Sequence, residues 1–240
     1  MKKGMLVLAV VLYACSLFSF CYYVKLELDV YYLMTLTERF TYLLLACLLL
    51  YGGSIVLVKV SNENSKKIMT ITFQIFFAFY VILMITITLF DPLLRSGSTR
   101  VVFDFELVSE YIKETANVRP FRMILLYWNG LNSGLLSLSV YLMNIVGNLV
   151  VMMPLAFFLP MLSKTFKKFI PFVITVTIVI LSIESLQAIT MSGYFDVDDI
   201  MLNLVGALIM FYFLRIPFVG LWVSELSCGS ITIHGRKKND

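Results

Sequence analysis

Apolar runs recur along the whole chain and are separated by short polar segments. Each run spans about 20 residues, enough for a helix to cross the hydrocarbon layer of a bilayer, which is about 30 Å thick. The runs do not alternate between apolar and polar positions, as the strands of a membrane barrel would. We therefore predict an all-α integral membrane protein with about six transmembrane helices. The predicted spans cover residues 4–23, 40–58, 68–90, 138–162, 169–190 and 200–222.

The distribution of charge predicts how these spans are oriented. With the N-terminus inside, most of the 19 Lys and Arg residues fall on the cytoplasmic side and most of the 15 acidic residues fall outside. Because cytoplasmic loops are enriched in Lys and Arg, we predict an N-in, C-in topology with a long outer loop between the third and fourth spans. In domain terms, residues 1–60 hold two additional N-terminal helices, residues 68–222 form the membrane core, and residues 223–240 form a cytoplasmic polar tail.

Composition agrees with a membrane protein and excludes several kinds of chemistry. Of the 240 residues, 60% are hydrophobic and only 14% are charged, which is more apolar surface than a soluble domain of this length can bury. The four cysteines have no CxxC or framework spacing, so we predict neither disulfides nor a zinc site. The single histidine, His234, lies in the polar tail, which removes histidine chemistry from the spans. Basic residues are not interleaved with aromatics in a patch, so we expect no nucleic-acid partner.

Polar side chains gather in the outer halves of the last three predicted spans. A carboxylate at the centre of a membrane helix costs on the order of 2.5–3.5 kcal/mol even on lenient scales. The three spans follow one another with short connections, so their polar faces are expected to pack together. The candidates for a polar pocket are Glu184, Gln187, Asp196, Asp198, Asp199, Asn203, Asn144 and Asn148.

Each of these positions also has a structural alternative. Asp198 or Asp199 alone is typical of a helix N-cap, because an Asp side chain satisfies free backbone N–H groups. The asparagines are also suited to hydrogen bonds between membrane helices, worth about 0.6 kcal/mol each. Glu184 is the residue that a structural role explains least well, since it lies about two turns inside the fifth span.

Four motifs contain the polar candidates. They are Asn117-Val118-Arg119-Pro120-Phe121; Asn144-x-x-Gly147-Asn148 followed by Met153-Pro154-Leu155-Ala156-Phe157; Ser182-Ile183-Glu184-x-x-Gln187; and Asp196-Val197-Asp198-Asp199-x-x-x-Asn203-x-x-Gly206-Ala207. In order and spacing, these motifs resemble those of the VanZ-like family of small membrane proteins. The resemblance covers about residues 79–215. The first two spans resemble an addition to the family core.

One departure from the family pattern bears on the site, besides the milder change to Ala156 in the fourth span. The family often carries a basic residue two positions before the phenylalanine that precedes the aspartates, and this chain has Gly193 there. Arg119 and Arg122 lie on the same predicted outer side. We therefore consider these two arginines as alternative candidates for binding an anionic headgroup.

The resemblance implies reduced susceptibility to glycopeptide antibiotics, teicoplanin in particular. We hypothesise a multi-pass cell-membrane protein of the cell envelope. Its outward-facing polar pocket would bind an anionic lipid headgroup or a lipid-linked cell-wall precursor. The expected partners are then membrane lipids.

Two other functions fit the same residues. The first is a metal-dependent intramembrane enzyme acting on polyprenyl or phospholipid phosphates, because carboxylate and amide oxygens suit Mg²⁺, Mn²⁺ or Ca²⁺. Its metal candidates are Glu184, Asp198 and Asp199, and Glu184 could act as an acid or base; no catalytic residue is assigned. The second is a transporter that couples to ions through Glu184, although the chain shows no internal repeat.

Overall fold

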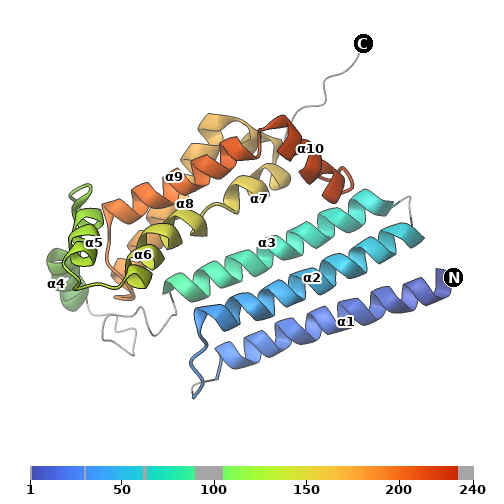
Figure 1. The fold of residues 1–240 in the computed structure, drawn as a ribbon, viewed down its shortest axis with the longest axis horizontal. Helices are drawn as coiled ribbons and strands as arrows, with labels where there is room; N and C mark the ends of the chain where they lie inside the picture. Colours follow the sequence, from blue (N-terminus) through green and yellow to red (C-terminus); the bar gives the residue numbers. More distant parts are fainter. Residues whose placement is uncertain (1, 30, 62–63, 90–104, 232–240) are drawn as a thin grey trace, which may run out of the picture. The chain divides into compact units, whose positions relative to one another are not determined.

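The long apolar runs form helices, as expected where backbone N–H and C=O groups have no water to bind. The computed structural model describes residues 2–29, 31–61, 64–89 and 105–231, in which helices alternate with short connections (Figure 1). Within these described residues, five helices are long and apolar enough to cross a membrane, and a bent pair makes a candidate sixth. The predicted all-α membrane fold with about six spans is confirmed, whereas the N-in, C-in orientation stays a prediction. The five are α1 (Lys2–Glu27), α2 (Leu36–Val60), α3 (Ser65–Leu89), the stretch Leu138–Leu162 and α8 (Phe169–Ile189).

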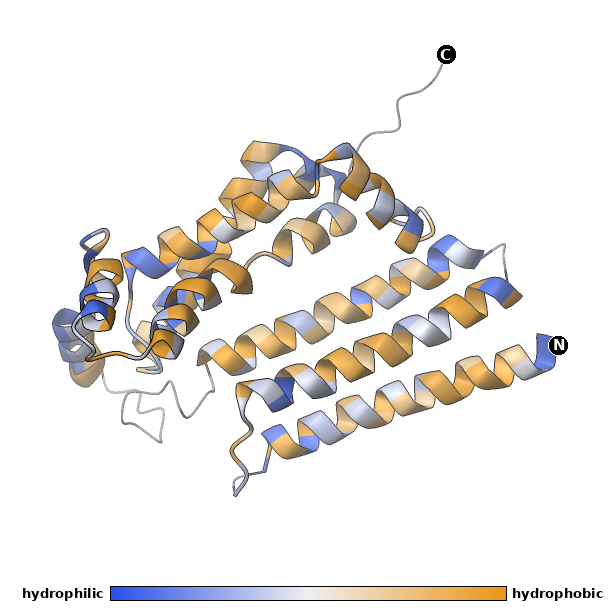
Figure 2. Cartoon of the chain, in the orientation of Figure 1, coloured by the Kyte–Doolittle hydropathy of each residue, from blue (hydrophilic) through white to orange (hydrophobic). Residues whose placement is uncertain are grey.

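Hydropathy along the ribbon fits this assignment. Apolar residues extend over most of the length of the long helices, and hydrophilic residues gather towards helix ends (Figure 2). Many large apolar side chains are exposed, including Val7, Phe18 and Ile178, each more than half accessible. A soluble protein would bury such side chains, whereas a bilayer provides an apolar solvent for them.

Two predicted spans are interrupted. The sixth, residues 200–222, consists of α9 (Val197–Phe213) and α10 (Pro217–Leu226), which meet at an angle of 85°. Pro217 lacks a backbone N–H, and its ring disfavours helical geometry in the preceding residue, so the helix restarts there. The fourth, residues 138–162, divides into α6 (Leu138–Val151) and α7 (Leu155–Leu162) beside Pro154, for the same reason. Phe90, residues 91–104 of the predicted outer loop and the tail from 232, including His234, lie outside the described residues.

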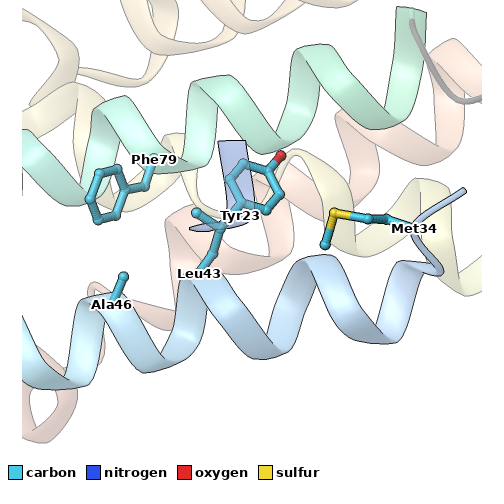
Figure 3. Packing of buried hydrophobic residues seen from close by; sticks show 5 residues of the cluster. All are labelled: Tyr23, Met34, Leu43, Ala46 and Phe79. Carbon is cyan, nitrogen blue, oxygen red and sulfur yellow. The ribbon is translucent and has the colours of Figure 1, made fainter. Parts of the chain in front are cut away.

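The chain divides into two compact units, one containing residues 2–83 with 221–231 and the other residues 84–220. In the first unit, a cluster of buried side chains from α1, α2, α3 and the α1–α2 connection forms the core; its members are Tyr23, Met34, Leu43, Ala46 and Phe79 (Figure 3). Polar contacts supplement it: the Ser54 and Thr72 hydroxyls are 2.6 Å apart, and Arg39 donates to the Glu27 carboxylate at 3.0 Å. The boundary between the two units falls within α3. The predicted division into two N-terminal helices, residues 1–60, and a membrane core, residues 68–222, stays a prediction.

In the second unit, α9 is the central helix and packs against α6, α7 and α8. Two short helices, α4 (Phe105–Thr115) and α5 (Arg122–Asn132), complete it. The closest approach is between α6 and α9 at Gly206, where an added Cβ would lie 1.7 Å from the Leu149 carbonyl oxygen. A glycine at this point lets the two backbones come together, as small residues commonly do in membrane helices.

Replacing Gly206 by alanine is therefore expected to destabilise the second unit. The added methyl group would push α6 and α9 apart, and overpacking of this kind typically costs about 1–3 kcal/mol. The matched control is Gly147→Ala, also in a helix of this unit, because a Cβ there meets nothing within 4 Å. The midpoint of thermal unfolding in detergent should fall for Gly206→Ala and stay level for Gly147→Ala; equal midpoints would contradict the close packing.

Candidate functional site

Two of the sequence motifs are joined in the structure through Asn117 and Asp196. These residues form an isolated parallel bridge: the Asn117 N–H donates to the Phe195 carbonyl at 2.8 Å, and the Val197 N–H donates to the Asn117 carbonyl at 3.0 Å. The Asn117 side-chain amide also donates to Asp196 Oδ1 at 2.7 Å. Thus the segment before α5 is fastened to the start of α9, and Asn117 has a positional role.

Asp196, rather than Asp198 or Asp199, is the N-cap of α9. Its Oδ1 accepts the backbone N–H of Asp198 at 2.8 Å, which satisfies one of the free donors at the helix start. The side chain is almost fully buried, and this burial raises the pKa of the Asp196 carboxyl, while the hydrogen bond from Asn117 opposes the rise. The predicted pocket residue Asp196 therefore serves to begin a helix and to hold Asn117.

Asp198 also caps a helix, but the helix is α5. Its carboxylate is 1% exposed and accepts the backbone N–H groups of Phe121 at 2.5 Å, Met123 at 2.7 Å and Ile124 at 3.2 Å. Phe121 has a left-handed backbone, with φ 64°, and this turn directs the first amides of α5 towards the carboxylate. A negative charge at a helix N-terminus is favourable because the free N–H groups and the helix dipole point at it. Both oxygens of Asp198 are used in this way, which leaves it poorly placed as a metal ligand.

Most of the remaining predicted pocket residues line one small space, which we term the polar cavity. Its volume is about 50 Å³, and it lies among α6, α8, α9 and the end of α3. The polar side chains on its wall are those of Glu184, Gln187, Asp199, Asn203, Asn148 and Thr88, and the apolar ones are those of Val151, Met152, Ile180 and Ile183. Glu184 and Asn203 are each only 4% exposed. The structure thus brings amides and carboxyls from α6, α8 and α9 together at these residues.

Hydrogen bonds fix most of the polar side chains of the cavity. Glu184 Oε2 accepts the backbone N–H of Asp196 at 3.2 Å, and the Asn148 amide donates to Asp199 Oδ1. The Gln187 amide donates to the Thr88 carbonyl at 3.0 Å. Within the described part of the chain, Asn203 Oδ1 is buried and has no hydrogen-bond partner. Among the residues that the structure describes, the lining contains two carboxylates and no Lys, Arg or His.

The other predicted site residues lie outside the polar cavity. Asn144, one turn before Asn148, accepts the Tyr127 hydroxyl at 3.1 Å and donates to the Val140 carbonyl at 2.8 Å, so it links α6 to α5. Arg119 and Arg122 are exposed, and they flank the turn whose amides bind Asp198. Both arginines therefore lie on the surface. Their segment is hydrogen-bonded to Asp198, which is adjacent in sequence to Asp199 of the polar cavity.

The polar cavity offers oxygen atoms rather than a familiar metal-binding cluster. Among residues 2–29, 31–61, 64–89 and 105–231, no group of three or more His, Cys, Asp or Glu side chains is arranged to hold a metal. The two carboxylates of the cavity are accompanied by amide groups instead. Thr88 was not anticipated, because it lies about 100 residues before Gln187 in sequence and only the hydrogen bond from Gln187 shows that the two are neighbours.

By its fold and its site, the protein is a multi-pass helical membrane protein with a buried polar centre built from three spans. The family model VanZ/LLP1 matches residues 76–219, which is more than half of the chain, and the protein belongs to this family. The matched region contains the whole polar cavity and both motifs that join α5 to α9. No curated protein and no solved structure matches the chain.

Proposed function

We propose that this protein acts in the cell envelope, in the cell membrane, and lowers susceptibility to glycopeptide antibiotics such as teicoplanin. It does so by binding an anionic lipid headgroup or a lipid-linked cell-wall precursor at the polar cavity and the surface beside it, which alters access of the antibiotic to its target. The observation that carries the proposal is the polar cavity itself. It lies in the region matched by the family, and it holds groups that are costly to bury without a purpose.

The volume of the polar cavity and the negative charge of the ligand indicate that two parts of the protein contact the ligand. A volume of about 50 Å³ is far below the roughly 300–1,000 Å³ of a typical ligand pocket, so only a small polar group can enter the polar cavity. The anionic part of the ligand belongs outside, where Arg119 and Arg122 are exposed. A guanidinium binds phosphate or carboxylate through two parallel hydrogen bonds. In this arrangement the arginines supply affinity, and the polar cavity discriminates among ligands.

Deleting the gene should lower the inhibitory concentration of teicoplanin several-fold, and expressing it in a sensitive host should raise it. An antibiotic with an intracellular target provides the control, because its inhibitory concentration should not change. Unchanged teicoplanin susceptibility in both backgrounds would refute the proposal. Arg119→Gln combined with Arg122→Gln should weaken protection without lowering the amount of protein, since both side chains are exposed.

A metal-dependent enzyme acting on polyprenyl or phospholipid phosphates is the second candidate. It is favoured by one specific feature, namely that Glu184 and Asp199 reach the same enclosed space from different helices. Hard oxygen donors of this kind can hold an ion that stabilises a leaving phosphate. Purified protein incubated with Mg²⁺ and a polyprenyl diphosphate should then release inorganic phosphate, and absence of turnover for polyprenyl and phospholipid substrates removes this candidate.

A further inference from the structure

The polar cavity holds acidic groups without a neutralising side chain. Glu184 comes from α8 and Asp199 from α9, and both line the same space, whose described lining contains no Lys, Arg or His. Two like charges close together in a medium of low dielectric repel each other strongly. The site therefore requires a positive charge, or protons, from outside the protein's own side chains.

Several donors around the polar cavity are engaged in hydrogen bonds. The Asn148 amide donates to Asp199 Oδ1, the Gln187 amide donates to the Thr88 carbonyl, and the Asp196 N–H donates to Glu184 Oε2. In the described part of the chain, no hydrogen bond reaches the second oxygen of either carboxylate. The second oxygen of each carboxylate is therefore left to contact a ligand.

Asn203 adds a third acceptor and is an independent sign of a ligand. Its side chain is 4% exposed and lines the polar cavity, and its Oδ1 has no partner among the described residues. Leaving a buried carbonyl oxygen unpaired costs free energy, and buried polar atoms in proteins are nearly always satisfied. Asn203 lies four residues after Asp199, so the two side chains project from the same face of α9.

We infer that the polar cavity binds one divalent metal cation, held by Glu184 Oε1, Asp199 Oδ2 and Asn203 Oδ1. Two carboxylates balance a charge of +2, and an oxygen-only set suits Mg²⁺, Mn²⁺ or Ca²⁺ rather than a softer metal. The cavity volume of about 50 Å³ also admits a few waters, each needing about 10–15 Å³ or more by this measure, and these waters complete the coordination shell. Asp198, a metal candidate from the sequence, is excluded because α5 occupies both of its oxygens.

The cation gives the acidic cavity a means of accepting an anionic ligand. The role of the cation, though not its binding, rests on the proposed function. By offsetting Glu184 and Asp199, the ion removes their repulsion of a phosphate or carboxylate that is held by Arg119 and Arg122.

The test is Mn²⁺ binding to the full chain purified in detergent, followed by the electron paramagnetic resonance signal of free Mn²⁺. One Mn²⁺ should bind per chain and be displaced by Mg²⁺ or Ca²⁺. Glu184→Gln and Asp199→Asn should each weaken binding by about tenfold or more, in line with losses seen at metal sites. The matched control is Glu114→Gln, which removes an exposed carboxylate on α4 and should leave affinity unchanged.

Asn203→Asp separates the cation site from a merely structural role. A third carboxylate should tighten Mn²⁺ binding, an effect that loss of folding cannot imitate. Absence of Mn²⁺ binding at millimolar concentration, or equal binding by the Glu184→Gln, Asp199→Asn double variant, overturns the cation site. If Mn²⁺ does not bind but expression still raises the teicoplanin inhibitory concentration, only the cation site fails. If Mn²⁺ binds and susceptibility is unchanged, only the proposed function fails.

Discussion

Replacing Asp198 by alanine is expected to remove roughly 3–5 kcal/mol of folding free energy, the range seen when one partner of a buried charged contact is deleted. The carboxylate is 1% exposed and is the acceptor for three backbone amides at the start of α5. Alanine would leave those donors buried and unpaired, at about 1–3 kcal/mol for each group that water cannot reach. A loss of this size is comparable to the whole stability of many domains. We therefore expect little folded protein in the membrane.

The amount of protein in the membrane fraction and the midpoint of thermal unfolding in detergent measure this effect. Asp198→Asn should give an intermediate result, because the amide keeps one acceptor oxygen but loses the charge that favours a helix N-terminus. The matched control is Asp199→Asn, one position along, which should accumulate normally. Wild-type abundance and unfolding midpoint for Asp198→Ala would show that α5 does not depend on this cap.

The contrast between Asp198 and Asp199 shows where the sequence stops being informative. The apolar runs predict the spans directly, because a helix that crosses the bilayer must be apolar over the whole thickness of the hydrocarbon layer. Two adjacent residues on a helix point about 100° apart, and only the neighbours of α9 decide what each one meets. Asp198 meets the amides of α5, whereas Asp199 meets Asn148 and the polar cavity. From the sequence alone, Asp198 and Asp199 are both candidates for the polar pocket, and their different contacts cannot be predicted.

Asn144 and Asn148 illustrate the same limit on one helix face. Their spacing of four residues correctly places them on the same side of α6. Yet Asn144 binds Tyr127 of α5, and only Asn148 lines the polar cavity. The split arises because α5, a short helix in the long segment between α3 and α6, packs against α6 beside Asn144. Its position depends on the bridge between Asn117 and Asp196, a contact between residues 79 positions apart.

Under the proposed function, Glu184→Gln and Asp199→Asn are each expected to abolish protection against teicoplanin while the protein accumulates at close to its normal level. Each change keeps the size of the side chain and an oxygen that can accept the existing hydrogen bond from the Asp196 N–H or the Asn148 amide. What each change removes is a negative charge in the polar cavity. The fold should lose little stability, because neither carboxylate pairs with a basic side chain among the described residues of the lining. A site that binds through charge, in contrast, would lose its ligand.

The measurement is the inhibitory concentration of teicoplanin in a deletion strain complemented by each variant, read alongside the amount of protein in the membrane. Asn144→Leu is the matched control: it removes a polar side chain from α6 outside the polar cavity and should keep most of the protection. If Glu184→Gln and Asp199→Asn protect as well as the wild type at equal abundance, the polar cavity is not the functional site. If both variants fail to accumulate while Asn144→Leu does not, the two carboxylates hold the helices together, and the functional surface is to be sought at the exposed arginines.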